Sequence, residues 1–326
     1  MKFGVFLNQY YTPDGDFEVT DLYEQVELME AVGFDFAALG ERHVHREGIV
    51  EPLSTLAAIG ARTEDLGLAT TAMLPALHDP LLLAEQVAMI DRLTDGRMAF
   101  GGAIGYRERE LTPFGVEMDD RAGAFMEALE LCKRFWNEES VTHDGDRWSY
   151  DDVFVSPRPA DGMPVWIGGH ADIAIKRAAY RGDAWIASAS STTEDLDRQI
   201  GVYEDALDEF DEDRADNDIV LMRDCFVADD AETARETIEP HLLELYRLYA
   251  RWGQTYVDEH EVEVDYDELE EKFVLGSPAE CVDQLRTYED LGVDQVVVRV
   301  QFPGQPQAPT LECLERFGTE VATEFE

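Results

Sequence analysis

The sequence predicts a (β/α)8 TIM barrel with insertions, folded as one domain over residues 1–326. Short apolar runs alternate with amphipathic helical patterns, which is typical of a parallel sheet covered by helices. Eight such strand-like runs within 326 residues favour a closed barrel over a doubly wound sheet. No G-x-G-x-x-G follows the first run, which disfavours a dinucleotide-binding sheet.

The first two units of the expected barrel occupy residues 2–61. Residues 2–8 (KFGVFLN) form the first strand, and an amphipathic helix over 21–32 ends at Gly33. The second strand, 34–39, runs into Gly40-Glu41-Arg42-His43, and a helix is expected over 52–61.

Residues 66–106 read as strand, crossover helix and strand. The run 66–74 meets a breaker at Pro75, and an apolar helix follows over 80–93. The turn Asp95-Gly96 leads into a run over 97–103 that ends among glycines. Backbone in such a glycine-rich loop can approach a ligand closely.

The middle of the chain interrupts the alternation once. A helix over 119–136 is followed by an insertion near 140–156, where the turn Asp144-Gly145 between alternating runs predicts a hairpin. The remaining strands are expected at 164–170, 183–189, 219–228 and 295–300, and the remaining helices at 171–180, 193–210, 278–288 and 310–323. Residues 229–275 contain further helix and an acidic insertion near 240–275, most acidic at 258–271, which we interpret as a solvated face.

The net charge of −45 comes from 71 Asp and Glu against 26 Lys and Arg, and only four of the basic residues are Lys. Because phosphate binding needs a basic face, nucleic acid is not an expected partner. An acidic protein kept apart by its charge is one explanation. The low Lys content favours another, a halophilic protein of a salt-accumulating cytoplasm, where salt screens the self-repulsion.

The four cysteines are widely spaced and form no C-x-x-C, so neither a disulfide framework nor a metal site is predicted. No run of about 18 apolar residues is present, so no membrane span is expected. The N-terminus lacks the apolar region and cleavage site of a signal peptide. We therefore expect a cytoplasmic protein.

In a (β/α)8 barrel the chemistry lies at the C-terminal ends of the strands. That rule selects Asn8, Gln9 and Tyr10; Glu41, Arg42, His43 and His45; Thr70 to Met73; Gly105, Tyr106, Arg107 and Arg109; Gly168, Gly169 and His170; Ser188, Ser190 and Ser191; and Arg299 and Gln301. An imidazole such as that of His43 suits proton transfer near neutral pH. His78, at the start of the third helix, is expected to be structural.

Four segments, in order, resemble the bacterial luciferase-like monooxygenase family of flavin-dependent oxidoreductases. They are GFDFAALGERH (33–43), ALHDPLLLAEQVAMIDRLTDGRMAFGGAIGYRERELTPFGV (76–116), PVWIGGHADIAIKRAAYRGDAWI (164–186) and VLGSPAECVDQLRTYEDLGVDQVVVR (274–299). The resemblance covers most of the chain and implies a (β/α)8 barrel that binds a flavin.

The resemblance also implies roles for individual residues. Glu41, Arg42 and His43 stand where the family has a Glu-His-His triplet, and they are the expected catalytic group. Thr70, Thr71 and Ala72 match a bulge against the isoalloxazine ring, and Tyr106 is expected beside the flavin. Gly168, Gly169 and His170 resemble a phosphate-binding element at a helix start. Ser188 and Ser190 are either phosphate or ribityl contacts or a helix N-cap run. Ile104 stands where luciferases have a phosphate-binding Arg, for which Arg107 or Arg109 is a substitute.

The expected function is a flavin-dependent monooxygenase that uses reduced FMN and O2 on a small organic substrate. The reduced flavin would come from a separate flavin reductase. One alternative is a dehydrogenase or reductase that uses the deazaflavin coenzyme F-420. Another, suggested by Arg42 in the triplet, is a non-catalytic flavin-binding partner subunit. The family's association through the helices flanking the second and third strands implies a homodimer.

Overall fold

The structure, a computed structural model, describes residues 1–7, 18–45, 50–160, 162–252 and 266–325. Its centre is a closed barrel of eight parallel strands among the described residues, with the order β1-β2-β3-β4-β7-β8-β9-β11 and back to β1. These strands are β1 Lys2–Phe6, β2 Phe36–Leu39, β3 Gly67–Thr70, β4 Met98–Gly102, β7 Val165–Gly168, β8 Ala184–Ala187, β9 Asp218–Val227 and β11 Gln295–Arg299. The predicted fold class is confirmed.

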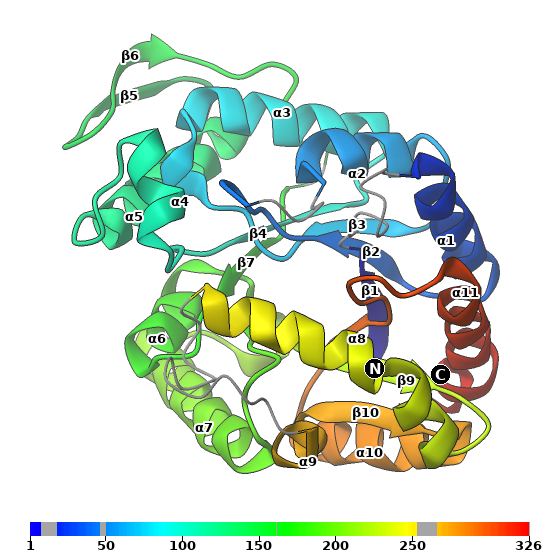
Figure 1. The fold of residues 1–326 in the computed structure, drawn as a ribbon. Helices are drawn as coiled ribbons and strands as arrows, with labels where there is room; N and C mark the ends of the chain where they lie inside the picture. The colour runs from blue at the N-terminus through cyan, green and yellow to red at the C-terminus, as the bar shows by residue number, and fades with distance from the viewer. Residues whose placement is uncertain (8–17, 46–49, 161, 253–265, 326) are drawn as a thin grey trace.

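Helices surround the barrel on all sides (Figure 1). They are α1 Val19–Ala31, α2 Pro52–Gly60, α3 Pro80–Leu93, α4 Glu108–Leu111, α5 Arg121–Asn137, α6 Asp172–Arg181, α7 Thr193–Phe210, α8 Ala231–Arg251, α9 Tyr266–Leu269, α10 Pro278–Asp290 and α11 Gln307–Arg316. Several begin at side-chain caps, as Asp79 accepts hydrogen bonds from the first turn of α3 and Ser277 from that of α10. None of the helices described combines the length and apolarity that a membrane crossing needs.

The barrel interior is filled by side chains of alternate strand residues. Phe36 and Trp166 meet edge to face with ring centroids 5.6 Å apart. The neighbouring inward positions are small, since Ala38 and Ala69 lie on adjacent strands in register. Gly4 is required here, because a Cβ at that position would lie 2.2 Å from the Phe36 ring.

In the described residues the same sheet has a ninth strand, β10 Phe273–Gly276, which was not predicted. It pairs in parallel with the last residues of β9, whose first residues pair with β8 inside the barrel. Asp224 of β9 pairs with both β10 and β11, so these two strands lie on opposite edges of β9. Strand β10 therefore occupies the edge of β9 that β8 leaves, outside the closed ring.

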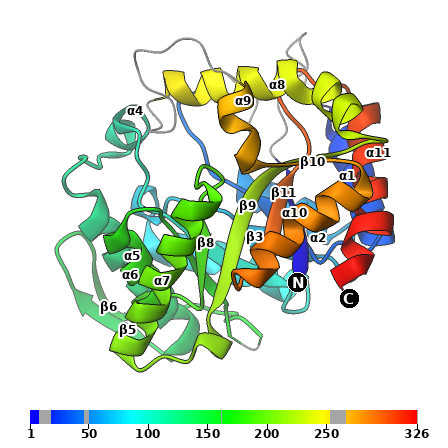
Figure 2. The ribbon, with the colours of Figure 1, turned by 90° about the horizontal axis from the view of Figure 1, so that it is seen from below.

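Helix α8 crosses the end of the barrel that lies opposite the chain's N-terminus (Figure 2). Since β1 begins at Lys2, that end holds the C-terminal ends of the parallel strands. The helix follows β9 and packs on β9 and β10. Its C-terminal end reaches the region of α4, on the other side of the mouth.

The interruption at 140–156 is an antiparallel hairpin of β5 Val141–Asp144 and β6 Ser149–Val153. In the turn, the Gly145 N–H donates to the Trp148 carbonyl. Much of the expected acidic insertion, residues 253–265, lies outside the described residues, as do Asn8, Gln9 and Tyr10.

Candidate active site

Glu41 is the buried centre of the site. It follows β2, its side chain is 2% exposed, and its own N–H donates to the Ala72 carbonyl at the end of β3. Its Oε1 lies 2.6 Å from His43 Nε2 and 2.7 Å from His78 Nε2. Its Oε2 accepts the Leu74 N–H at 2.6 Å. The carboxylate thus joins the ends of β2 and β3 to the segment that starts α3.

The hydrogen bonds around Glu41 decide its charge. Burial alone would raise the pKa of Glu41, but hydrogen bonds from His43 and His78, the charge of His78 and the Leu74 N–H lower it to about 2. The hydrogen bond to Glu41 raises the pKa of His43 against the opposing effect of burial, and the negative charges of Glu41, Glu110 and Glu51 add to the rise. The geometry therefore favours an ion pair of Glu41 carboxylate and His43 imidazolium.

A second buried carboxylate, Glu110 on α4, lies beside this pair. It is fully buried and its Oε1 accepts the His43 backbone N–H at 2.6 Å. Arg42 Nη1 lies 3.7 Å from Glu110 Oε2, and Arg107 Nη1 lies 3.9 Å from Oε1. Glu110 therefore holds the segment after β2 against the segment after β4.

Trp252, the residue that caps α8, reaches these arginines across the mouth. The Arg107 guanidinium lies 4.6 Å from the centroid of the Trp252 ring, and that of Arg42 lies 5.4 Å from it. Arg42 also lies 4.9 Å from the ring of Tyr106. These cation–π contacts fix α8 over the ends of β2 and β4.

Residues 70–72 lie at the end of β3, next to the Glu41 group. The hydroxyl of Thr70 donates to the Gly101 carbonyl at 2.8 Å and accepts the Gly101 N–H at 2.7 Å, which ties β3 to β4. The peptide bond between Thr71 and Ala72 is cis. The Thr71 hydroxyl is buried and has no hydrogen-bond partner among the described residues, while Ala72 is half-buried.

Residues 168–170 and 188–191 lie at the C-terminal ends of the neighbouring strands β7 and β8. Gln199 on α7 joins them, since its Nε2 donates to the His170 carbonyl at 3.2 Å and its Oε1 accepts the Ser191 hydroxyl at 3.0 Å. The hydroxyls of Ser188 and Ser190 lie 2.8 Å apart and are half-buried. These two loops therefore form one edge of the mouth.

Arg223 of β9 holds the loop 188–191 in place through hydrogen bonds to its backbone. The guanidinium of Arg223, 1% exposed, donates to the Ser188 carbonyl at 3.3 Å and to the Ser191 carbonyl at 3.0 Å. Gly169 allows α6 to approach closely, because a Cβ there would lie 2.4 Å from the Ala174 Cβ. His170 itself is exposed at the start of α6.

The site residues predicted from the sequence thus fall into two groups at the same end of the barrel. Glu41, Arg42, His43, Thr70, Thr71, Ala72 and Tyr106 surround the ends of β2, β3 and β4. Gly168, Gly169, His170, Ser188 and Ser190 lie at or just after the C-terminal ends of β7 and β8. Of the substitutes for the missing phosphate-site Arg, Arg107 is engaged with Glu110 and Trp252 in the first group.

One structural observation indicates that the residues at the barrel mouth fit a flavin-type cofactor. A buried hydroxyl without a partner costs about 1–3 kcal/mol, and Thr71 Oγ1 is such an atom at the position expected to face a ring system. A bound polar heterocycle would satisfy it. The half-buried Ser188 and Ser190 hydroxyls and the start of α6 supply donors for an anionic group.

Glu41, His43 and His78 are also the one group in the described ranges whose ligand-type atoms lie within 4.8 Å of one another. The separations of 2.6 and 2.7 Å are hydrogen-bond lengths. Two ligands of a tetrahedral zinc ion, each about 2.0–2.1 Å from it, would lie about 3.3 Å apart. The absence of a metal stays a prediction.

Three residues of the site were not singled out from the sequence. His78 was interpreted as a structural residue at the start of the third helix, although it lies within the segment 76–116 that carries the resemblance. Glu110 and Trp252 contact the site only through the packing of α4 and α8, and no local pattern marks them.

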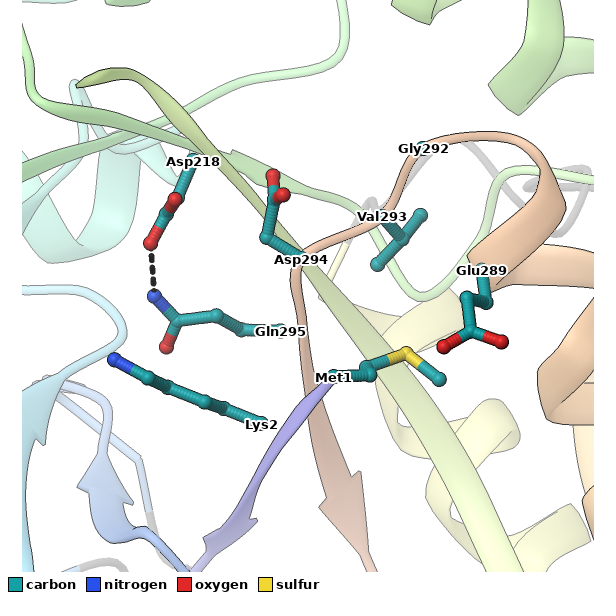
Figure 3. Close-up of a pocket in the computed structure, with 8 residues that line it drawn as sticks. All are labelled: Met1, Lys2, Asp218, Glu289, Gly292, Val293, Asp294 and Gln295. Atoms are coloured by element: carbon teal, nitrogen blue, oxygen red, sulfur yellow. Dashed lines mark hydrogen bonds between the residues drawn. The ribbon is translucent and has the colours of Figure 1, made fainter. Parts of the chain in front are cut away.

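A pocket of about 490 Å³ lies at the other end of the barrel (Figure 3). Gln295 Nε2 donates to Asp218 Oδ2 at 2.6 Å there, and Lys2 extends alongside them. Residues at this end of a (β/α)8 barrel contribute to stability, whereas catalytic residues lie at the opposite end. This pocket is therefore not the candidate active site.

Comparison with known proteins gives a consistent result for most of the chain. A family model described as luciferase-like monooxygenase matches residues 1–295. An F420-dependent glucose-6-phosphate dehydrogenase of Intrasporangium calvum is 27% identical over 318 residues, which cover 92% of this chain and 93% of that protein. The oxygenase component of a flavin-dependent trigonelline monooxygenase from Acinetobacter baylyi is 21% identical over 322 residues, covering 90% and 88%.

Among solved structures, the monooxygenase RslO1 of Streptomyces bottropensis superposes with a TM-score of 0.89. It is 24% identical, and the match covers 100% of both chains. At this identity the likeness supports the barrel fold.

Proposed function

Since this chain belongs to the luciferase-like monooxygenase family, we propose that it is a monooxygenase that uses reduced FMN and O2 to oxidise a small organic substrate. The family includes both flavin monooxygenases and deazaflavin-dependent dehydrogenases, so the relatives are oxidoreductases of either kind. The observation that carries the proposal is the 2.6 Å contact between the buried Glu41 carboxylate and the half-buried His43 imidazole, which adjoins the Thr71–Ala72 segment at the barrel mouth.

The two groups of mouth residues would hold the cofactor between them. Thr70, Thr71 and Ala72 would support its ring system, with Tyr106 beside it. The segment Gly168 to His170, which precedes α6, and the hydroxyls of Ser188 and Ser190 would bind its phosphate and ribityl chain. Reduced FMN, when bound, supplies the two electrons that activate O2.

His43 would hold and move the proton that the reaction needs. Its Nε2 is engaged with Glu41 at 2.6 Å, so Nδ1 is the ring atom that would exchange a proton with a bound molecule. Glu41 would keep the imidazolium charged and oriented. Arg42 stands between Glu110 and the Tyr106 ring and would add positive charge to the mouth.

Helix α8 would exclude water from this reaction. Trp252 contacts the arginines of the β2 and β4 ends, so the helix bridges the mouth. A site closed to water protects reactive oxygen chemistry from side reactions. The oxygenase component related to this chain is named as one part of a larger system, which supports a separate reductase as the source of reduced flavin.

A second candidate is a dehydrogenase or reductase that uses coenzyme F-420. It is favoured by the 27% identity to a deazaflavin-dependent sugar-phosphate dehydrogenase over nearly the full length of both chains. In that case the same His43–Glu41 pair would exchange the proton that accompanies hydride transfer, and O2 would have no role.

The deciding experiment is anaerobic titration of the purified protein, in high salt, with reduced FMN and separately with reduced coenzyme F-420. We expect micromolar binding of reduced FMN, followed by substrate-dependent O2 uptake when a flavin reductase is added. The variants Thr71→Val and Ser188→Ala should weaken FMN binding, while Ser149→Ala in the distant hairpin should not.

Each other outcome overturns the proposal in a different way. Tight binding of coenzyme F-420 alone would establish the second candidate. Binding of FMN without turnover on a broad substrate panel would favour a flavin-binding partner subunit. Binding of neither cofactor would reject the functional proposal as a whole.

A further inference from the structure

Two imidazoles converge on one carboxylate oxygen in the candidate site. His43 and His78 come from different segments, yet both place Nε2 within 2.7 Å of Glu41 Oε1. The other oxygen, Oε2, is engaged by the Leu74 N–H at 2.6 Å. Both imidazoles therefore share one oxygen of the carboxylate, while the other oxygen is held by the backbone.

We propose that His78 is a positioning residue that shares the charge of Glu41 with His43, so that the charge of His78 sets how firmly His43 holds its proton. In the proposed function, the role of His43 is to release and regain a proton. The charge of His78 would influence this proton transfer through Glu41 and not through contact with a bound molecule.

The balance of charges supports this sharing. With both imidazoles protonated, two positive charges face one carboxylate, and the three ligand-type atoms lie within 4.8 Å of one another. Loss of one proton leaves the group neutral, and loss of the second leaves the carboxylate uncompensated. Groups coupled in this way lose their protons in separate steps that belong to the pair.

The other charges that face the group are the same in each of these states. Glu110 of α4 and Glu51 at the start of α2 act on His43, and Arg42 and Arg107 lie against Glu110. Asp79, which follows His78, caps α3. The side chains of His43 and His78 are 27% and 25% exposed, so both can exchange protons with solvent.

The proposal is tested by NMR titration of the histidine Cε1–H signals in the purified protein without cofactor, in high salt. The variant His78→Gln keeps an N–H donor for Glu41 but cannot become charged, and His78→Ala removes both. We expect the His43 signal to follow two steps in the parent protein. In His78→Gln it should follow one step, displaced upward by about one pH unit.

His143→Gln is the matched control, because His143 has its own carboxylate partner, Glu127, 3.1 Å away beside the hairpin. It should leave the His43 titration unchanged. An unchanged His43 titration in His78→Gln would overturn the proposal, and so would a shift in His78→Ala alone, since that would reflect hydrogen bonding without charge.

A reciprocal measurement covers the case in which a His78 variant does not fold. The variant His43→Gln should displace the His78 signal upward by the same amount, because coupling between two sites is mutual. The absence of that displacement would also overturn the proposal.

A further measurement rests on the proposed function. The acidic limb of the pH profile of kcat/KM should move with the His43 titration in His78→Gln. Coupling seen by NMR in a protein that proves inactive would reject the proposed function and leave the charge sharing in place.

Discussion

Glu41 is a buried charge whose stabilising effect has a defined pH range. The pKa of its carboxyl is lowered from 4.5 to about 2, so its contribution is present above pH 4.5 and is lost as the pH falls through about 2. The pKa of His43 is raised from 6.5, so its part of the ion pair is complete below pH 6.5 and is lost as the pH rises through the raised value. The pair therefore contributes fully between pH 4.5 and 6.5.

The variant Glu41→Gln should lose this contribution. A shift of that size corresponds to about 3 kcal/mol of unfolding free energy near pH 6. Urea unfolding in high salt at several pH values measures it, and the difference from the parent protein should narrow toward pH 2. Glu127→Gln, which removes a more exposed carboxylate beside His143, should cost less than about 1 kcal/mol. Equal losses for the two variants would contradict the argument.

A second buried ion pair lies at the ends of β9 and β11. Arg299 Nε and Nη2 lie 2.6 and 2.5 Å from Asp224 Oδ1, and the Tyr246 hydroxyl donates to Oδ2 at 2.9 Å. Arg299→Met removes the counter-charge of a carboxylate that is 1% exposed, and we expect a loss of about 3–5 kcal/mol.

The double variant Arg299→Met/Asp224→Asn tests the origin of that loss. It removes the buried charge but keeps an acceptor for Tyr246, so it should recover more than half of the stability in thermal unfolding. If it were less stable than Arg299→Met, lost packing of the arginine would be the dominant effect.

Single residues of the site were predictable only where the barrel rule applies to them. Glu41, His43, Thr71 and Ser188 come just after a strand and Gly168 ends one, which made them candidates from position alone. His78 joins the site through a turn between β3 and α3, and Trp252 through a helix that crosses the mouth. Such contacts depend on tertiary packing, which cannot be predicted from the position of a residue relative to a strand end.

At the scale of elements, helix α3 presents apolar side chains to solvent. Leu82, Met89 and Leu93 are 54%, 44% and 68% exposed on this helix. A soluble protein rarely leaves a set of large apolar residues uncovered on one helix. We therefore propose that α3 lies in the interface of the homodimer that the family resemblance implies.

The double variant Leu82→Glu/Leu93→Glu should therefore convert a dimer into a monomer. Added charges in an apolar interface are costly to desolvate. Light scattering after size-exclusion chromatography in high salt measures the mass. Ile173→Glu, at a residue of α6 that is 73% exposed, is the control and should leave the mass unchanged. A parent protein that is already monomeric would reject the dimer.

The elements themselves were largely predictable because each one has its own local pattern. All eight barrel strands coincide with predicted apolar runs, whereas the strand at residues 273–276 and the short helices α4 and α9 were not predicted. Those four residues, FVLG, follow a highly acidic stretch and form β10. The alternation of strand and helix that predicts a (β/α)8 barrel does not predict this strand, because β10 pairs with β9 outside the closed ring.

For the whole molecule, the net charge of −45 causes repulsion between surface carboxylates that salt in the solvent can screen. Raising KCl from about 0.1 M to about 1 M shortens the Debye length from about 10 Å to about 3 Å, which screens repulsion between surface carboxylates. We expect the melting temperature to rise by several degrees over this range, where each kcal/mol corresponds to about 2–4 °C.

Calorimetry or circular dichroism in a KCl series measures this effect. Sucrose at matched osmolality is the control, because it strengthens burial without screening charge. A melting temperature that is independent of KCl, or that rises equally in sucrose, would contradict the halophilic interpretation.

The division of β9 between two neighbours affects how this fold can vary among relatives. Its first half completes the hydrogen bonding of the barrel, and its second half carries β10 beyond it. The chain between β9 and β10 can therefore lengthen or shorten over evolution without altering any backbone hydrogen bond between the strands of the closed ring. Since α8 belongs to that interval, the part of the protein that covers the mouth can be replaced while the barrel is inherited unchanged.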